Sequence, residues 1–361
     1  MSYSGSSSLH IADWADKICG PVASTEVQYT DLANALAGMS SGQVLLVKAG
    51  TYAMTADMVL PNGVSIVLED LRGGVIVDFG GGAYYLTTPS HTAKAADCAD
   101  YQSNVAPTTV SIGAGHGTIE AAVDADPTAY SVVFGGILYP IQSINTSTHV
   151  ITVSSTIPSL HDGSQACVFI LKNDYPHDVT MKGRLTLQNT SADRLAKFSE
   201  CVNYDLSGLK ATLIGAGVSS MACVHCHLGS WTAENQNWQT SWVSSINAPA
   251  SQVAADWRFL NIATACGAST SCSMCDIGSA TEDDWVRGLR LSVEIANCTP
   301  TGAQADIAMY ALLTRLSNKQ FSITGSVHGT LGKGAGVQYD LRYAASMLSY
   351  SGLGYGTSLA L

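Results

Sequence analysis

Four carboxylates in the second half of the chain have a spacing that fits acid–base chemistry on a glycosidic bond. Enzymes that cleave such bonds hold two carboxyl groups about 5–10 Å apart, one of them acting as the acid. Glu200 and Asp205 are close enough in sequence to lie within one turn of the chain. Glu234 and Asp256 flank a long polar stretch, residues 231–255, which we interpret as a protruding loop. Either pair is a candidate acid and base.

Tryptophans gather at the same stretch of sequence. They are Trp231, Trp238, Trp242 and Trp257. An indole ring combines a broad apolar face with one N–H donor, so exposed rings on a loop would make platforms for sugar rings. This is the best glycan-binding site that the sequence offers. The alternative is that these rings pack the loop onto the body of the protein or into a subunit interface.

Cysteine pairs give a second candidate site. Cys223 and Cys226 form one C-x-x-C pair, and Cys272 and Cys275 form another. Four converging thiolates could hold a structural zinc ion. The segment Cys223–His227 also matches the C-x-x-C-H pattern of covalent haem attachment, but a β-strand context and a single copy argue against haem. The simplest interpretation is reduced cysteines stacked inside the fold, so we predict no cofactor.

The spacing of other cysteines supports stacking. Cys201 to Cys223 is a step of 22 residues (223 − 201), and Cys275 to Cys298 is a step of 23 (298 − 275). Steps of this size are within the range of solenoid repeats. Small residues that recur once per coil are expected to form an interior ladder.

The elements that must position these residues are short β-strands. Val44–Val47, Val64–Leu68 and Val75–Phe79 are apolar runs bounded by Gly, Pro or Asn. Runs of that length and composition predict buried strands, and the gaps between them are too short for crossover helices. A chain that coils, with each coil laid in parallel on the last, satisfies both observations. A helix at 30–39, with Thr30 or Asp31 as N-cap, would close the open end of the stack.

The same segment resembles a known family. Leu32–Leu36, Gly42–Tyr52, Leu60–Ile66 and Val75–Asp78 are similar in order and motif to the first coils of pectate-lyase-like right-handed β-helices, in the version found in bacteriophage tailspikes and related virion proteins. The match covers roughly residues 30–82, with looser coil spacing from about 178 onward. The resemblance implies a right-handed parallel β-helix with an N-terminal capping helix. The acidic cluster that pectate lyases use for calcium is not found in this sequence, which disfavours lyase activity.

Composition excludes several functional classes. Charged residues make up 12% of the 361, Gly numbers 34, and the formal net charge is −11. Because no basic run exists, binding to nucleic acid through its phosphates is not expected. No stretch is long and apolar enough to span a membrane, and the Ser-rich residues 1–10 do not read as a signal peptide. We therefore expect synthesis in a host cytoplasm, with the cysteines reduced.

The pattern divides the chain into five parts. We predict an N-terminal arm or anchor at 1–29, the first coils with their capping helix at 30–104, a small antiparallel β-insert at 105–177, the main β-helix at 178–350 and a tail at 351–361. The Gly113–Gly117 cluster is assigned to a strand–turn context within the insert. Low charge and Val/Ile/Tyr-rich strands predict apolar flanks that meet between subunits, most simply in a homotrimer.

Two hypotheses of function follow from these features. The first is a structural protein on the surface of a bacteriophage virion, a spike or head decoration, adhesive or stabilising, contacting capsid or tail through its N-terminal arm. The second is a tailspike depolymerase that cleaves host surface polysaccharide with Glu234/Asp256 or Glu200/Asp205. A shared groove holding either pair would favour the second.

Overall fold

The computed structural model describes most of the first 301 residues and short strands beyond them. The described residues are 14–90, 108–112, 117–134, 137–157, 168–190, 194–221, 223–238, 244–247, 250–265, 272–277, 286–287, 289–301, 309–314, 321–328 and 348–351. The prediction for Trp242 and that for the tail from residue 352 onward lie outside them.

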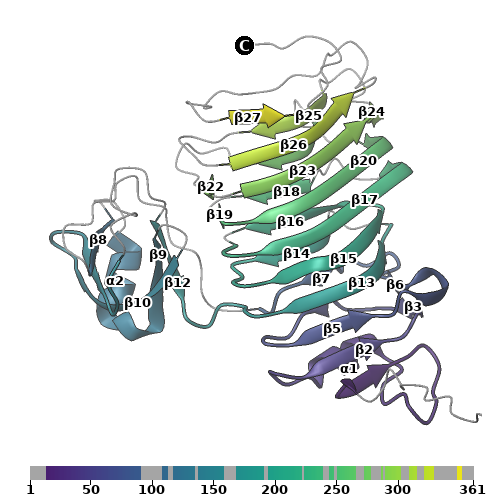
Figure 1. Ribbon diagram of the computed structural model, residues 1–361, viewed down its shortest axis with the longest axis horizontal. Helices are drawn as coiled ribbons and strands as arrows, with labels where there is room; N and C mark the ends of the chain where they lie inside the picture. Colours follow the sequence, from purple (N-terminus) through teal and green to yellow (C-terminus); the bar gives the residue numbers. More distant parts are fainter. Residues whose placement is uncertain are drawn as a thin grey trace, which may run out of the picture.

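The described chain forms a parallel β-helix, a rod in which the strands of successive coils stack into two long sheets (Figure 1). Sheet A, with all its pairings parallel, runs in the order β1 (Lys17–Cys19), β2 (Val44–Val47), β5 (Ser65–Leu68), β13 (Thr180–Gln188), β15 (Asp205–Ile214), β17 (His227–Trp238), β20 (Ala254–Ala265), β23 (Leu289–Ala296), β26 (Phe321–His328) and β27 (Leu348–Ser351), with β3 (Gly50–Ala53), β6 (Val75–Asp78) and β24 (Thr299–Thr301) paired alongside. The fold expected from the first strands is confirmed.

Sheet B is the second wall of the rod. It is also parallel and contains β4 (Met58–Val59), β7 (Leu86–Thr87), β14 (Arg194–Ser199), β16 (Gly217–Met221), β18 (Ser244–Asn247), β21 (Cys272–Ile277) and β25 (Met309–Thr314). A separate short pair joins β19 (Ala250–Ser251) to β22 (Val286–Arg287). Side chains from the inner faces of both sheets form one continuous apolar core.

Coil length varies along the rod. Equivalent positions in sheet A are Thr180, Asp205, His227, Ala254, Arg290 and Ser322. Successive coils therefore take 25, 22, 27, 36 and 32 residues (205 − 180, 227 − 205, 254 − 227, 290 − 254 and 322 − 290). The expected coil of 22 or 23 residues describes only one of them.

A short helix closes the N-terminal end of the rod, as predicted. Helix α1 spans Leu32–Ala37, and the Asp31 carboxylate accepts a hydrogen bond from the Asn34 N–H at 2.8 Å. Leu32, Ala35 and Leu36 are buried against the first strands. The helix thus covers an apolar end that would otherwise face water.

The prediction that residues 1–29 form an N-terminal arm is wrong from Lys17 onward. Strand β1 pairs with β2 in parallel register, and Cys19 bridges to Tyr29, so residues 17–29 belong to the first coil. The part of the proposed anchor before Trp14 lies outside the described residues.

An antiparallel insert stands beside the rod (Figure 1). Its five strands are β8 (Thr109–Ser111), β9 (Tyr130–Phe134), β10 (Ile137–Asn145), β11 (Val150–Val153) and β12 (Val168–Lys172), in the order β12-β9-β10-β11-β8. Helix α2 (Gly117–Ala125) packs on the sheet through Val123. The strand–turn expectation is wrong at Gly117, because Glu120, Ala121 and Ala122 favour a helix.

The insert also contacts the rod. Val133 and Leu171 of the insert form a small buried cluster with Val202 and Val224, which lie in two stacked turns of the rod. The turns that carry the cysteines are therefore covered on their outer side by the insert.

The long loop predicted at 231–255 is also wrong. Residues 231–238 continue β17, 244–247 form β18 in sheet B, and β20 begins at Ala254. Along β17 the side chains alternate between buried and partly exposed positions, as Trp231, Thr232, Ala233 and Glu234 show. The polar residues that resembled a loop are the outward half of a strand.

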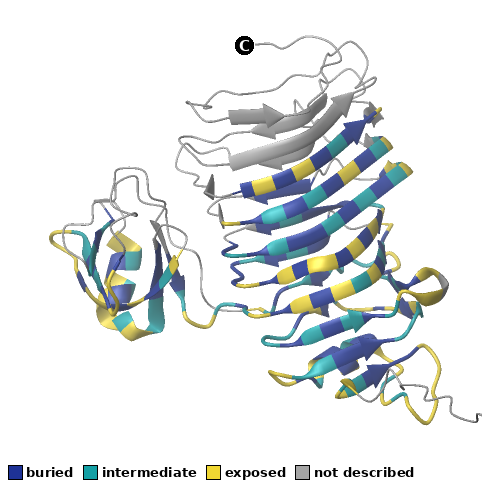
Figure 2. Ribbon diagram, viewed as in Figure 1, coloured by how far each residue is buried: buried dark blue, intermediate teal, exposed yellow. Residues whose placement is uncertain are grey.

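The rod does not show the predicted apolar flank among its described residues. Outward positions of β13 and β15 are mostly polar, and Figure 2 shows exposed and buried residues alternating along these strands. The exposed large apolar side chains are scattered: Trp14, Val22, Val59, Leu71, Ile137 and Ile214. The described part of the chain therefore offers no continuous apolar surface through which two rods could pack.

Candidate functional site

The outer face of sheet A carries a polar groove across β17, β20 and β23. Ser230 and Thr232 come from β17, Asp256 and Arg258 from β20, and Ser292 and Glu294 from β23. The hollow measures about 370 Å³. In-register parallel pairing places these residues in two rows, Ser230–Asp256–Ser292 and Thr232–Arg258–Glu294.

Arg258 organises the charges of the groove. Its Nε donates to Glu294 Oε2 at 2.7 Å, and its Nη1 donates to Glu234 Oε1. These bonds, the one to Glu294 foremost, raise the pKa of the guanidinium above its already high value. A planar guanidinium held from both sides has little freedom left to lose when it binds a ligand.

Asp256 forms the other charged end of the groove. Its Oδ2 accepts a hydrogen bond from the Ser230 hydroxyl at 3.1 Å. Carboxylates accept hydrogen bonds, a guanidinium donates them and hydroxyls do both. The groove can therefore hydrogen-bond a polyhydroxylated molecule through several groups at once.

The predicted pair Glu234 and Asp256 shares this face but does not meet. Glu234 lies opposite Leu260, four residues beyond Asp256 along β20. At about 3.3 Å per residue the two backbone positions are about 13 Å apart along the strand. Arg258 lies between them, bound to Glu234.

The second predicted pair is also separated by its surroundings. Glu200 follows β14, has a positive φ of 52° and is only 5% exposed. Asp205 begins β15 and is exposed, and hydrogen bonds from Ser207 lower its pKa. One carboxylate faces the interior while the other faces solvent, so they do not open into one groove.

The tryptophans expected to stack on sugars are core residues. Trp231, Trp238 and Trp257 are 0%, 2% and 2% exposed. Trp238 packs edge-on against Phe259, whose ring also lies 6.3 Å from that of Trp257. The glycan-stacking prediction is wrong for these three because they occupy inward positions of β17 and β20.

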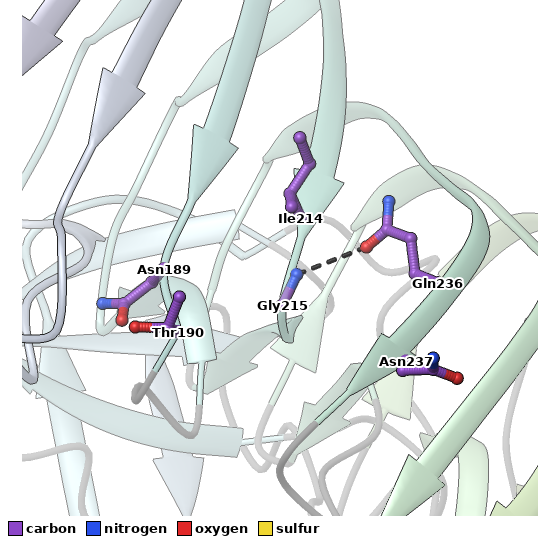
Figure 3. A pocket seen from close by; sticks show the side chains of 6 residues that line it. All are labelled: Asn189, Thr190, Ile214, Gly215, Gln236 and Asn237. Carbon is purple, nitrogen blue, oxygen red and sulfur yellow. Dashed lines mark hydrogen bonds between the residues drawn. The ribbon is translucent and has the colours of Figure 1, made fainter.

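Sheet A turns a corner beyond the groove, and a polar hollow lies there. Asn235, Asn261 and Asn297 occupy equivalent positions with φ of 52–53°, and their side chains are linked in a ladder by hydrogen bonds of 2.8 and 3.1 Å. In the coils below, Asn189, Thr190, Ile214, Gly215, Gln236 and Asn237 line a hollow of about 500 Å³ (Figure 3).

Most of the polar groups that line this corner hollow already form hydrogen bonds within the rod. Gly215 N–H donates to Gln236 Oε1 at 3.3 Å, the contact drawn in Figure 3, and Gln236 Nε2 donates to the Leu213 carbonyl at 2.7 Å. Asn189 Nδ2 donates to the Gly82 carbonyl at 2.7 Å. We therefore take the groove with Arg258, rather than the corner, as the candidate binding site.

The cysteines are arranged differently from the predicted quartet. Cys201, Cys223 and Cys226 lie together inside the rod, with Cys201 Sγ 3.3 Å from Cys223 Sγ and 3.7 Å from Cys226 Sγ. Burial, reinforced by the two neighbouring thiols, raises the pKa of Cys201 well above its usual value. The 22-residue step from Cys201 to Cys223 is thus confirmed as a stacked pair.

Cys272 and Cys275 belong to β21, two strands away from β16 in sheet B, so the backbone that carries them is about 10 Å from the strand that leads to Cys223. Their side chains lie outside the described part of the chain. Of the predicted four-cysteine site, the described cluster therefore contains only the first pair. The expected Cys275–Cys298 ladder is wrong, because Cys298 follows β23 in sheet A and its thiol donates to the Phe259 carbonyl.

Sequence reasoning missed both Arg258 and Glu294, which pair across two strands. The signal was present as polar residues at alternate positions: Ser230, Thr232 and Glu234 in one segment, and Asp256 and Arg258 in the next. Assigning residues 231–255 to a loop hid this alternation.

Comparisons with solved structures found matches among phage tailspikes. The tailspike gp49 from Pseudomonas phage LKA1 matches over 88% of this chain and 53% of its own, at 13% identity and a TM-score of 0.38. The gp54 tailspike of Acinetobacter baumannii bacteriophage AP22, in complex with A. baumannii capsular saccharide, matches over 90% and 66%, at 13% identity and a TM-score of 0.27. Tailspike gp61 of Pseudomonas phage phi297 matches over 88% and 76%, at 11% identity and a TM-score of 0.25. This chain spans about half of the first and two thirds of the second.

No protein-family model matches the sequence, and a comparison with curated proteins found no match. Neither helix in the described part of the chain has the length and apolar content of a membrane span. The identities and TM-scores of the structural matches are too low to transfer any residue's role. By its strand pairing this chain is a parallel β-helix protein, and three of the solved structures that it matches are phage tailspikes.

Proposed function

We propose that this chain is a spike or decoration protein of a bacteriophage virion that binds a host surface polysaccharide along the outer face of sheet A. The observation that carries the proposal is the groove across β17, β20 and β23, in which a guanidinium, carboxylates and hydroxyls face outward from one rigid sheet. The similarity of residues 30–82 to the first coils of virion β-helices supports the virion setting.

The polar character of the groove fits a sugar polymer better than a protein partner. The groove has no exposed aromatic ring among its described residues, because Trp231 and Trp257 turn inward. Interfaces between proteins are enriched in exposed aromatic anchors at their centre. Binding through Arg258, Asp256 and Glu294 would instead rely on hydrogen bonds to hydroxyl groups.

The proposal is tested by polysaccharide binding with two matched arginine variants. Purified protein would be titrated against capsular and lipopolysaccharide fractions from a panel of bacterial hosts. Arg258→Ala should weaken binding at least tenfold. Arg184→Ala is the control, because Arg184 is also about half exposed on sheet A and pairs with a carboxylate, Asp70, at 2.9 Å. Binding unchanged by Arg258→Ala, or no binding to any fraction, would refute the assignment.

A depolymerase is the second candidate, and one pair of residues favours it. Asp256 lies opposite Ser292, and Glu294 is two residues further along β23. Strand spacing of about 4.8 Å and rise of about 3.3 Å per residue place their Cα atoms about 8 Å apart on the same face. That separation is compatible with an acid and base on a glycosidic bond.

Release of reducing ends from the bound polysaccharide separates the two candidates. A depolymerase predicts release that is abolished by Asp256→Asn and by Glu294→Gln even at polysaccharide concentrations high enough to saturate binding. A purely adhesive protein predicts binding without release. The homotrimer expected from the low charge and the Val/Ile/Tyr-rich strands is a prediction of its own, and the mass of the purified protein by light scattering would check it.

A further inference from the structure

Three thiols from two successive coils converge in the core of the rod. Cys201 follows β14, and Cys223 and Cys226 come from the equivalent turn one coil later. Their three sulfur atoms all lie within 4.8 Å of one another. The residues are 0%, 0% and 2% exposed, so the cluster is sealed from solvent.

The backbone holds this arrangement rigidly. Val224 bridges to Val202 of the turn below, with Val224 N–H donating to the Cys201 carbonyl at 2.9 Å. His225 has a φ of 52°, which reverses the chain between the two cysteines. In a regular strand Cys223 and Cys226 would face opposite sides, but this left-handed residue lets both point inward.

The sulfur triangle has the dimensions of a thiolate metal site. A three-coordinate ion at the centre of three sulfurs, with metal–sulfur bonds of about 2.3 Å, holds those sulfurs about 4 Å apart. Two edges of the triangle measure 3.3 and 3.7 Å. A small outward movement of Cys223 would admit an ion at the centre.

A second observation points to a missing partner beside the thiols. Tyr204, three residues after Cys201, is 0% exposed, and its hydroxyl has no hydrogen-bond partner among the described residues. Its ring is held edge-on against Phe198. Buried hydroxyl groups in native proteins are nearly always hydrogen-bonded. None of the three sulfurs accepts from this hydroxyl in the structure, so a ligand or a shift of the cluster is needed to pair it.

We propose that Cys201, Cys223 and Cys226 bind one thiophilic metal ion of the zinc, cadmium or copper(I) class. Soft thiolate ligands select such ions over calcium or magnesium. On binding, each thiol loses its proton to solvent and each sulfur gives a lone pair to the ion. Because the site is sealed, the ion enters while the coils form and then joins two coils from within.

The test measures metal in the folded full-length chain. Protein produced in zinc-supplemented medium under reducing conditions should carry one zinc per chain by elemental analysis, retained through dialysis. Cys226→Ala should lose it. Cys298→Ala is the matched control, since Cys298 is equally buried and its thiol also donates to backbone carbonyls, at 3.5 Å. It should keep the ion.

A test with cadmium uses the wild-type protein alone, so it does not require that any variant folds. Wild-type protein refolded with cadmium should show the ultraviolet charge-transfer absorption of cadmium thiolates. Absence of that band together with absence of zinc and copper would overturn the proposal. So would equal metal content in Cys226→Ala and Cys298→Ala, or peptide mapping that shows a Cys201–Cys223 disulfide in the native protein.

Discussion

The asparagine ladder at the corner of sheet A offers the sharpest test of how the rod is held. Asn261 is its middle member: its Nδ2 donates to Asn235 Oδ1 at 2.8 Å, and its Oδ1 accepts from Asn297 Nδ2 at 3.1 Å. All three have positive φ, a conformation that costs most side chains about 1–2 kcal/mol but that asparagine tolerates. Asn261 therefore contributes both a conformation and two hydrogen bonds.

Two substitutions separate these contributions. Asn261→Ala loses both hydrogen bonds, worth about 0.5–1 kcal/mol each at an exposed site, and adds the strain of a positive φ. We expect a loss of about 2–3 kcal/mol in the free energy of unfolding. Asn261→Gly loses the same bonds without the strain, so its cost should be about 1 kcal/mol smaller. Asn237→Ala, whose φ is not positive, should stay within about 0.5 kcal/mol of wild type.

These differences in free energy are measured by denaturant unfolding, with circular dichroism as the signal. If unfolding is irreversible, the unfolding rates of the variants at a fixed temperature are compared instead. The reasoning fails if alanine and glycine at position 261 are equally destabilising, because the conformational strain would then be absent. It also fails if neither variant differs from Asn237→Ala, because the ladder would then add nothing to stability.

Three further predictions address the coil corner, the core and the acid response. Gly215→Ala should sharply lower soluble yield, because its Cβ would lie 1.9 Å from the Asn189 carbonyl oxygen at a φ of 118°, whereas Gly80→Ala, at a φ of 61° with nothing within 4 Å, should cost only about 1–2 kcal/mol in thermal unfolding. Trp231→Ala should destabilise by about 3–5 kcal/mol in denaturant unfolding, as a buried ring does, yet leave polysaccharide affinity of the folded fraction unchanged. Hydrogen bonds from Ser207 lower the pKa of Asp205 in the folded state, so its contribution to the free energy of unfolding is present at neutral pH and is lost as the pH falls below about 4. The difference in free energy of unfolding between wild type and Asp205→Asn should therefore close in acid titrations.

The first coils could be predicted because local chemistry decides them. The apolar run at Val44–Val47 is strand β2, and the run beginning at Val75 is strand β6. The helix with its Asp31 cap was also foreseen, since an aspartate before an amphipathic turn satisfies the first free N–H groups without help from the rest of the fold. These segments have one buried face and clear breaks between them.

The candidate site could not be predicted because it depends on register across coils. Arg258 and Glu294 are 36 residues apart in sequence, and they meet only because β20 and β23 pair in parallel without a shift. The cysteine cluster depends in the same way on a left-handed turn at His225, which a strand pattern does not reveal. Variable coil length, from 22 to 36 residues, removes any fixed repeat that could have predicted either contact.

Stacking in register also explains why the groove is chemically unusual within this chain. Neighbouring coils bring equivalent side chains about 4.8 Å apart, and like charges directly opposite each other are destabilising. A rod built this way tolerates few columns of like charge, and the charged content of the chain is only 12%. The groove nevertheless concentrates Asp256, Glu234 and Glu294 around Arg258. Removing Arg258 would leave two carboxylates without their shared cation, so this residue serves the stack and the proposed binding face together, and a ligand that approaches the groove meets charges already fixed in place.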